Sequence, residues 1–198
     1  KRCIILGGGA RSAKETIKTF VETLDAPTVS TVNARDLLGL HDLHIPASPS
    51  LKPVRDLLKE ADLVIALGTE MGQTDYDMYE DDLFPTLKNL IRVDVDKDQL
   101  RESPAGTRNV RGDVNAFCKE ILNHIKVEKQ SASKAIVKNC KNSVQLEIPK
   151  HYKACALIIT TIVKNLPNVI LVGDSTQPTY YGNLYCEITN KNRWFNSA

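Results

Sequence analysis

The sequence predicts an α/β fold with a parallel β-sheet that is covered by helices on both faces. Strand-like and helix-like segments alternate along the first part of the chain, which is typical of parallel sheets. The segment 62–68 is a nearly continuous apolar run, as in strands that are buried on both faces. Glycines follow the first apolar segment directly, at Gly7, Gly8 and Gly9. We therefore expect a Rossmann-like, doubly wound domain.

The composition is that of an ordinary globular protein. Among 198 residues, 26 Lys and Arg stand against 24 Asp and Glu, and the formal net charge is +2. Because the basic residues are scattered, neither a nucleic-acid partner nor a membrane surface is expected. No apolar stretch approaches the roughly 20 residues that cross a bilayer, and the N-terminus lacks the features of a signal peptide. Five cysteines without a C-x-x-C pair favour a reducing, cytoplasmic location over disulfides or a zinc ribbon.

The expected elements of the first domain follow this alternation. Strands are expected at 3–6, 28–32, 62–68 and 90–95, and residues 110–112 lead into the last helix. Helices are expected at 13–24, 51–60 and 114–125, because apolar side chains recur there at helical spacing. The apolar side chains concerned are Ile17, Phe20, Val21 and Leu24 in the first helix, Leu51, Val54, Leu57 and Leu58 in the second, and Phe117, Ile121 and Leu122 in the third.

A lysine- and serine-containing stretch divides the chain into two parts. We expect residues 1–126 to form a central domain and residues 127–150 to form a linker with some helical character. Beyond it, we expect a helix at 151–166, a buried strand at 168–173 and a loop rich in glycine and tyrosine. The core side of that helix is expected to carry Ala154, Leu157, Ile158 and Ile162. These elements cannot close a core alone, so residues 151–198 predict the N-terminal part of a second α/β domain, truncated within a longer parent protein.

The turn at Gly7, Gly8 and Gly9 admits two interpretations. Glycines between a strand and a helix let the backbone approach a phosphate, which the helix N-terminus then attracts. The spacing departs from G-x-G-x-x-G because Ser12 stands at the third required position, and a tight turn that needs glycine is the other interpretation. A second turn at Gly68 follows another expected strand and would lie at the same edge of the sheet.

Carboxylates follow two further expected strands. Asp94 lies near the end of the segment 90–95, and Asp96 follows that segment directly. Asp113 follows residues 110–112. Such a carboxylate can accept hydrogen bonds from a ribose, or it can cap the helix that follows. We expect capping for Asp96 and Asp113, and both roles remain open for Asp94.

No metal site is expected in this sequence. His41 and His44 lie close to two prolines and lack a third ligand, so we expect surface histidines. One acidic segment lacks the spacing of a calcium loop. Its carboxylates belong to Asp75, Asp77, Glu80, Asp81 and Asp82.

A further polar turn follows the expected strand at 168–173. It contains Asp174, Ser175, Thr176 and Gln177 directly after Gly173. Short polar side chains next to a glycine suit a bound phosphate or diphosphate. A simple turn built with glycine and aspartate is an equal alternative.

Taken together, these segments resemble the thiamine-diphosphate-dependent enzymes of the acetolactate synthase group. The resemblance covers residues 3–125 as the central domain of that group and residues 152–198 as the beginning of its diphosphate-binding domain. It rests on ILGGGA at 5–10, ADLVIALGTE at 61–70, IRVDVD at 91–96, Gly112-Asp113 and VGDSTQ at 172–177. The strings GTEMGQTDYD at 68–77 and RWFNSA at 193–198 look more like the branch of 5-guanidino-2-oxopentanoate decarboxylases than like biosynthetic acetolactate synthases.

The resemblance implies a longer enzyme that binds thiamine diphosphate and magnesium and acts on a 2-oxo acid, as a decarboxylase or as an acetolactate synthase-type transferase. Ser175, Thr176 and Gln177 match the family loop that contacts the diphosphate, and Asn196 and Ser197 begin a second loop near the cofactor. The magnesium motif is expected after the last residue of this chain, and the cofactor-activating glutamate before its first. We therefore expect no catalytic residue in this chain, no activity of the chain alone, and a parent that is a homodimer or homotetramer.

Some members of this group hold FAD or an adenine nucleotide on the central domain. After Gly68, this chain has T-E-M-G-Q-T-D where flavin-binding members carry an R-F-D-D-R-like run, so a flavin phosphate would lack an arginine partner and FAD is not expected. The positions that would contact a nucleotide are Gly7, Gly8, Gly9, Gly68, Thr69, Asp94 and Asp113. A nucleotide-binding or assembly module without a catalytic role is the alternative function. A sirtuin-like deacylase is disfavoured by the cysteine spacing.

Overall fold

The chain folds around a six-stranded parallel β-sheet of order β3-β2-β1-β4-β5-β6. The computed structural model describes residues 1–72, 84–102, 104, 106–126, 132–188 and 193–196. The strands are β1 (Arg2–Leu6), β2 (Thr28–Ser30), β3 (His44–Ile45), β4 (Leu63–Leu67), β5 (Leu90–Asp94) and β6 (Arg108–Arg111). The order reverses between β1 and β4, as in doubly wound dinucleotide-binding folds, so the predicted Rossmann-like fold class is confirmed.

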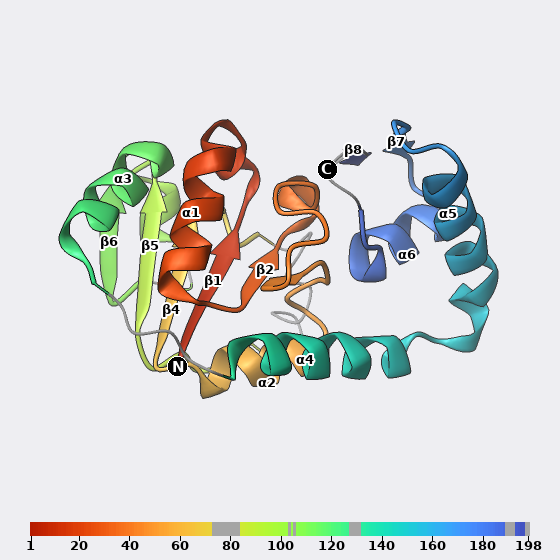
Figure 1. Ribbon diagram of the computed structural model, residues 1–198, viewed down its shortest axis with the longest axis horizontal. Coiled ribbons are helices and arrows are strands. Elements are labelled where there is room, and N and C mark those ends of the chain that lie inside the picture. Colours follow the sequence, from red (N-terminus) through yellow and green to blue (C-terminus); the bar gives the residue numbers. More distant parts are fainter. Residues whose placement is uncertain (73–83, 103, 105, 127–131, 189–192, 197–198) are drawn as a thin grey trace.

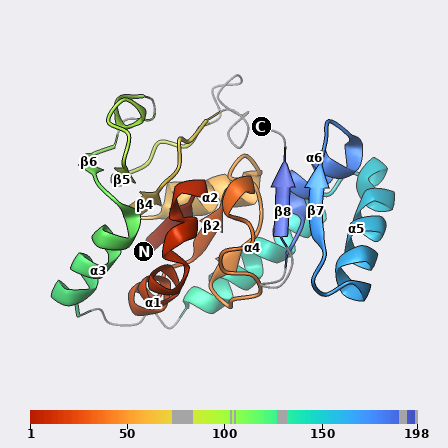
Figure 2. The same ribbon diagram turned by 90° about the horizontal axis from the view of Figure 1, so that it is seen from above.

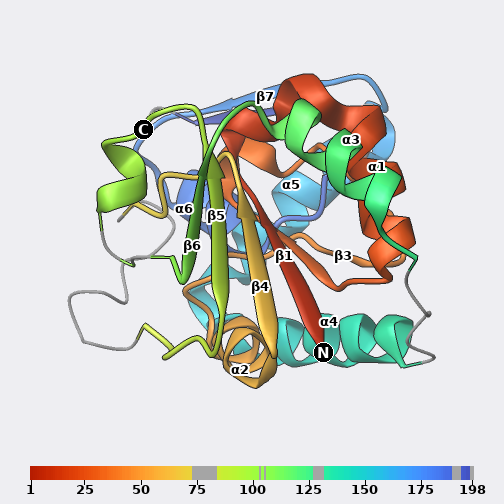
Figure 3. The same ribbon diagram turned by 90° about the vertical axis from the view of Figure 1, so that its left-hand side faces the viewer.

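Helices cover both faces of this sheet (Figure 1 and Figure 3). One face carries α1 (Lys14–Leu24), entered through the 3-10 helix η1 (Gly8–Ala13), and α3 (Val114–His124). The other face carries α2 (Lys52–Glu60) and α4 (Ser133–Glu147). Successive residues of a strand point to opposite faces of the sheet. In β1, Ile4 and Leu6 belong to the apolar cluster under α1 and α3, whereas Cys3 and Ile5 belong to the cluster on the face of α2 and α4. This double burial explains why the strands are apolar at consecutive positions.

The segment expected as a linker contains α4, a helix of 15 residues. Its apolar side chains Val137, Cys140 and Val144 are buried, and the helix packs on α2. Figure 1 shows α4 running beneath the sheet toward the C-terminal part of the chain. Among the described helices, none combines the length and the hydropathy that crossing a bilayer requires.

A second unit follows α4 and the 3-10 helix η5 (Lys150–Tyr152). It consists of α5 (Lys153–Asn165), β7 (Ile170–Gly173), α6 (Gln177–Tyr185) and β8 (Arg193–Asn196), whereas the six-stranded sheet with α1 to α4 forms the central unit. β7 and β8 pair in parallel, and Figure 2 shows them side by side with α5 on the outer side. Tyr181, Tyr185 and Trp194 belong to the same buried cluster as Cys3 and Ile5, so one apolar core joins the two units.

The prediction of a loop after β7 is wrong, because residues 177–185 form α6. Pro178 lies in the first turn of this helix, where its missing N–H costs nothing. Tyr181 and Tyr185, one helical turn apart, are both buried. Burial of this aromatic pair against the central unit stabilises the helix, although glycine and tyrosine are poor helix formers.

The predicted core side of α5 is also wrong. The structure buries Cys155 and Ile159, whereas Leu157 is 68% exposed and Ile158 51% exposed. Ala154 is exposed as well, and Ile162 is only half-buried. Nearly every position from 154 to 163 is apolar, so spacing alone cannot select a face. The packing of α5 on α6 makes that selection.

The strand at β7 is buried on one face only, although a fully buried strand was expected. Leu171 packs against the core, whereas Ile170 is 57% exposed and Val172 is 78% exposed. Side chains alternate along a strand, so these two residues share the opposite face. Among the described residues, that face of the two-stranded sheet remains open to solvent.

Candidate functional site

The glycine-rich turn after β1 packs directly on the turn after β4. The Gly9 N–H donates to the Gly68 carbonyl at 3.0 Å, and the Gly7 N–H donates to the Leu67 carbonyl at 3.0 Å. A Cβ at Gly7 would lie 2.2 Å from the Gly68 oxygen. Gly68 itself has a φ of +58°, and a Cβ there would lie 2.7 Å from the Gly9 carbonyl carbon. The glycines at these positions therefore allow two turns to touch.

This packing bears on the nucleotide that the glycine turn could hold. A pyrophosphate at the switch point needs free backbone N–H groups and room beside them. Here Gly9 donates to Gly68, and the Ala10 N–H donates to the Gly7 carbonyl at 3.1 Å. Thr69 is buried, and its Oγ1 accepts the Met71 N–H at 3.1 Å. The residues present do not fit a nucleotide pyrophosphate between β1 and β4.

The carboxylates at the strand ends bond to nearby backbone. Asp94 Oδ1 accepts the Asp96 N–H at 2.9 Å, and Asp96 Oδ1 accepts the Asp98 N–H at 2.8 Å. Asp113 Oδ1 accepts the Ala116 N–H at 2.9 Å and caps the N-terminus of α3, so the predicted cap is confirmed. These bonds order the turns at the carboxyl edge of the sheet.

Sequence reasoning missed a buried guanidinium that holds the same edge. Arg92 on β5 is 1% exposed and donates to the carbonyls of Glu102 at 2.9 Å, Pro104 at 3.1 Å and Glu70 at 3.2 Å. Arg92 thus ties the turn after β4 to the segment before β6. The signal was a basic residue inside an expected strand, with an apolar residue on either side of it, Ile91 and Val93.

A second edge brings together the two loops that were expected to approach the cofactor. β7 and β8 are parallel, and their register pairs Gly173 with Asn196. Parallel strands present their carboxyl ends at one edge, so the turn that starts at Asp174 begins beside Asn196. Ser197 lies outside the described residues.

The N-terminal end of α6 lies in this turn. Thr176 is the N-cap residue and its side chain makes no capping bond; its hydroxyl donates to the Asp174 carbonyl at 3.3 Å and lies 3.2 Å from the Thr179 hydroxyl. Ser175, Thr176 and Gln177 are all exposed. A Cβ at Gly173 would lie 2.6 Å from Thr179 Cγ2, so glycine lets the helix begin directly over the strand end.

The chemistry of this donor set fits a diphosphate. The first N–H groups of a helix lack partners within the helix, and the positive end of the helix dipole favours an anion. The exposed Ser175 hydroxyl and Gln177 amide add donors beside that end, and the Thr176 hydroxyl adds another when it turns away from the Asp174 carbonyl. The Ser175 N–H donates to Asp174 Oδ1 at 2.7 Å, which orders the turn.

No metal site is found in the described residues. None of their His, Cys, Asp and Glu side chains gather in groups of three or more that could hold an ion. The acidic segment that includes Asp75, Asp77, Glu80, Asp81 and Asp82 lies outside the described residues.

The expectation of surface histidines is wrong for His44, which is 1% exposed. Its Nδ1 lies 2.6 Å from the Gly39 carbonyl, and its Nε2 lies 2.8 Å from the Ser30 hydroxyl. These two partners replace water around the ring, which makes burial tolerable. His41 is half-buried, and its Nε2 lies 3.1 Å from Glu22 Oε1.

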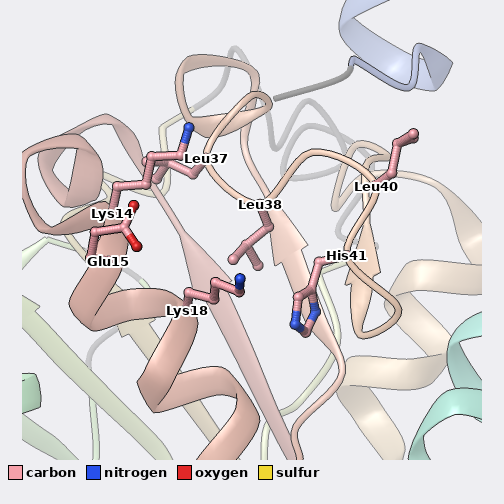
Figure 4. A pocket seen from close by; sticks show the side chains of 7 residues that line it. All are labelled: Lys14, Glu15, Lys18, Leu37, Leu38, Leu40 and His41. Atoms are coloured by element: carbon pink, nitrogen blue, oxygen red, sulfur yellow. The ribbon is translucent and has the colours of Figure 1, made fainter. Parts of the chain in front are cut away.

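The structure also holds a cavity of about 280 Å³ between α1 and the segment before β3 (Figure 4). Two lysines and one glutamate on α1 face the buried Leu37 and Leu38 and the exposed Leu40 across it. The lining residues are Lys14, Glu15, Lys18, Leu37, Leu38, Leu40 and His41. None of them is a predicted cofactor contact.

The sequence of the chain is similar to a known protein family and to individual proteins. Residues 1–121 match the family described as "Thiamine pyrophosphate enzyme, central domain". The chain is 31% identical over 185 residues to the "Probable 2-ketoarginine decarboxylase AruI" of Pseudomonas aeruginosa, a match that covers 91% of this chain and 32% of that protein. It is 33% identical over 135 residues to the "Sulfoacetaldehyde acetyltransferase" of Castellaniella defragrans, covering 62% of this chain and 21% of that protein. The chain thus spans a third or less of either relative.

Proposed function

Because the chain belongs to the thiamine pyrophosphate enzyme family, we propose that it forms the central domain and the beginning of the diphosphate-binding domain of a 2-oxo acid decarboxylase. The observation that carries the proposal is the register of β7 and β8, which pairs Gly173 with Asn196. Both loops that the family uses near its cofactor then start at one edge, beside the N-terminal end of α6.

The proposed roles of this chain's residues are binding and orientation. The Ser175 and Thr176 hydroxyls and the Gln177 amide would donate to diphosphate oxygens, and the N-terminal end of α6 would face their charge. Asn196 would approach the cofactor from the neighbouring strand. When bound, thiamine diphosphate supplies a ring that stores the electron pair released when a 2-oxo acid loses carbon dioxide. Magnesium, the proposed metal, would be held by residues elsewhere in the parent protein and would offset the negative charge of the diphosphate.

The proposed substrate is a 2-oxo acid with a guanidinium group. The similarity to a protein named a probable 2-ketoarginine decarboxylase covers 91% of this chain and supports this choice. 2-Ketoarginine and 5-guanidino-2-oxopentanoate are two names for one compound. An acetolactate synthase-type or other transferase is the second candidate, supported by the similarity to an acetyltransferase.

A nucleotide-binding module without a catalytic role gains no support from the glycine turn, because the Gly9 N–H already donates to Gly68.

A cytoplasmic location is part of the proposal. It is supported by the five cysteines, which are all buried and free of disulfides. A homodimeric or homotetrameric parent is also proposed, on the family resemblance alone.

The substrate is tested by measuring carbon dioxide release from the parent protein with 5-guanidino-2-oxopentanoate and with pyruvate. We expect release from the guanidino acid that requires thiamine diphosphate and is lost in a chelator. Acetolactate formed from pyruvate, with no turnover of the guanidino acid, would select the synthase instead.

The cofactor loop is tested with Thr176→Val, which removes the hydroxyl and its bond to the Asp174 carbonyl but no capping bond. We expect weaker binding of thiamine diphosphate, by roughly tenfold, the order of one hydrogen bond to a charged group. Thr160→Val is the matched control, because the Thr160 hydroxyl bonds only to carbonyls within α5. Equal affinities of the two variants would contradict the proposed contact.

A further inference from the structure

A buried arginine of the central unit holds the C-terminal end of α6. Arg35 follows the short 3-10 helix η2 (Val32–Ala34) and is 1% exposed. One terminal nitrogen donates to the Asn183 carbonyl at 2.6 Å. The other donates to the Cys186 carbonyl at 3.2 Å and to the Pro46 carbonyl at 2.9 Å. The guanidinium therefore bridges the segment after β3 and the last turn of α6.

The chemistry of these acceptors explains why a cation can be buried here. Carbonyls in the last turn of a helix lack partners within the helix, and the negative end of the dipole lies there. The planar guanidinium donates several hydrogen bonds in fixed directions, and this lets it satisfy separate carbonyls at once. A lysine could supply the charge but not the same fork of donors.

Other contacts hold the same end of α6. The Ser48 N–H donates to the Leu184 carbonyl at 2.9 Å, and Trp194 Nε1 donates to Asn183 Oδ1 at 2.9 Å. A Cβ at Gly182 would lie 2.1 Å from the Trp194 ring, so the helix rests against the indole. By contrast, the residues that start α6, Thr176 and Gln177, are exposed.

We propose that Arg35 is a positioning residue for the diphosphate loop. By holding the C-terminal end of α6 on the central unit, Arg35 fixes the axis of the helix. The N-terminal end, about 13 Å away along nine residues, is then held in place for an anion. This proposal rests on the proposed function, because it assigns that anion to thiamine diphosphate.

The test uses the parent protein with Arg35→Met, which removes the donors, and Arg35→Lys, which keeps the charge. Ile17→Ala is the control for general loss of stability. Ile17 is fully buried in the cluster on the other sheet face, and among the described residues that cluster contains none from the second unit. Two quantities are measured: amide deuterium uptake in residues 176–186, and the concentration of thiamine diphosphate that half-saturates activity.

We expect faster deuterium uptake in α6 for both Arg35 variants and unchanged uptake there for Ile17→Ala. The thiamine diphosphate concentration that half-saturates activity should rise about tenfold in Arg35→Met and less in Arg35→Lys. By contrast, kcat at saturating cofactor should stay within about twofold of wild type. If Arg35→Met does not fold, Arg35→Lys decides, because it preserves the buried charge.

Unchanged uptake in α6 of Arg35→Lys would overturn the proposal, and so would faster uptake with unchanged cofactor affinity. An Ile17→Ala variant that weakens the cofactor equally would overturn it too, because general destabilisation would then be the cause. If the wild-type parent does not bind thiamine diphosphate at all, the proposed function fails instead, and the deuterium measurement still shows whether Arg35 holds α6.

Discussion

The Ser30 hydroxyl donates a hydrogen bond of 2.8 Å to Nε2 of His44, and both side chains are buried on neighbouring strands of the sheet. The Gly39 carbonyl can only accept, so His44 Nδ1 carries the proton and donates to it. Burial lowers the pKa of His44 to about 3, with a smaller contribution from the Arg35 charge. The imidazole is therefore neutral in the folded chain.

This neutral ring makes stability depend on pH. The unfolded chain binds a proton at His44 near pH 6.5, whereas the folded chain does so only near pH 3. As far as His44 is concerned, the free energy of unfolding is thus highest above about pH 6.5. It falls with decreasing pH, by about 1.5 kcal/mol between pH 6.5 and pH 5. Urea unfolding at several pH values checks this. His44→Asn should lose this slope and the exposed control His124→Asn should keep it; equal slopes in both would contradict the assignment.

The contact between the two glycine turns predicts a strong difference between two glycine substitutions. Gly7→Ala places a Cβ against the Gly68 carbonyl and should cost about 2–3 kcal/mol, because backbone must move. Gly112→Ala meets nothing within 4 Å and should be neutral or stabilising by less than about 1 kcal/mol. Denaturant unfolding measures both. A Gly7→Ala variant as stable as wild type would show that the turns can separate.

The cysteines should be unreactive in the folded chain. Burial raises the pKa of Cys3, Cys118 and Cys140 to about 12 and that of Cys186 to about 11. Only about one thiol in a thousand or fewer would be a thiolate at pH 8, and the thiolate is the reactive form. A thiol reagent should label all five cysteines after unfolding and none quickly before it. We expect Cys140 to react first, because it lines a groove between α2 and α4; rapid labelling of Cys3 would contradict its burial.

The 198-residue chain alone should release no carbon dioxide from a 2-oxo acid. The contacts proposed for a diphosphate lie in this chain, but its described residues form no cluster of side chains that could hold the metal ion. The assay contains thiamine diphosphate, Mg²⁺ and 5-guanidino-2-oxopentanoate or pyruvate, and measurable turnover would refute the prediction. The same preparation should be colourless, because the Gly9 N–H that a flavin pyrophosphate would need already donates to the Gly68 carbonyl. A visible flavin absorbance band in stoichiometric amount would contradict this.

Segments rich in apolar residues predicted the inner strands of the sheet well. The expected strand at 62–68 is β4, Leu63–Leu67, and the one at 90–95 is β5, Leu90–Asp94. Strands that are buried on both faces leave little ambiguity in the sequence. The cap at Asp113 was also predictable, because N-capping depends on residues only a few positions apart.

What could not be predicted depends on partners far away in the sequence. The glycine turn left two interpretations open, and only the approach of Gly9 to Gly68 decides between them. His44 lies in a loop-like segment, and its burial requires Ser30 on another strand. The candidate diphosphate loop was identified by family resemblance, but its relation to Asn196 needed the β7–β8 register.

The hydrogen bonds of Arg35 also bear on the order in which the chain folds. Its acceptors Asn183 and Cys186 are 148 and 151 residues away in sequence. During synthesis the N-terminal strands leave the ribosome first, so Arg35 remains hydrated while the sheet forms. Closing so long a loop costs entropy that only a preformed sheet can offset. We therefore expect the second unit to pack after the central sheet has formed.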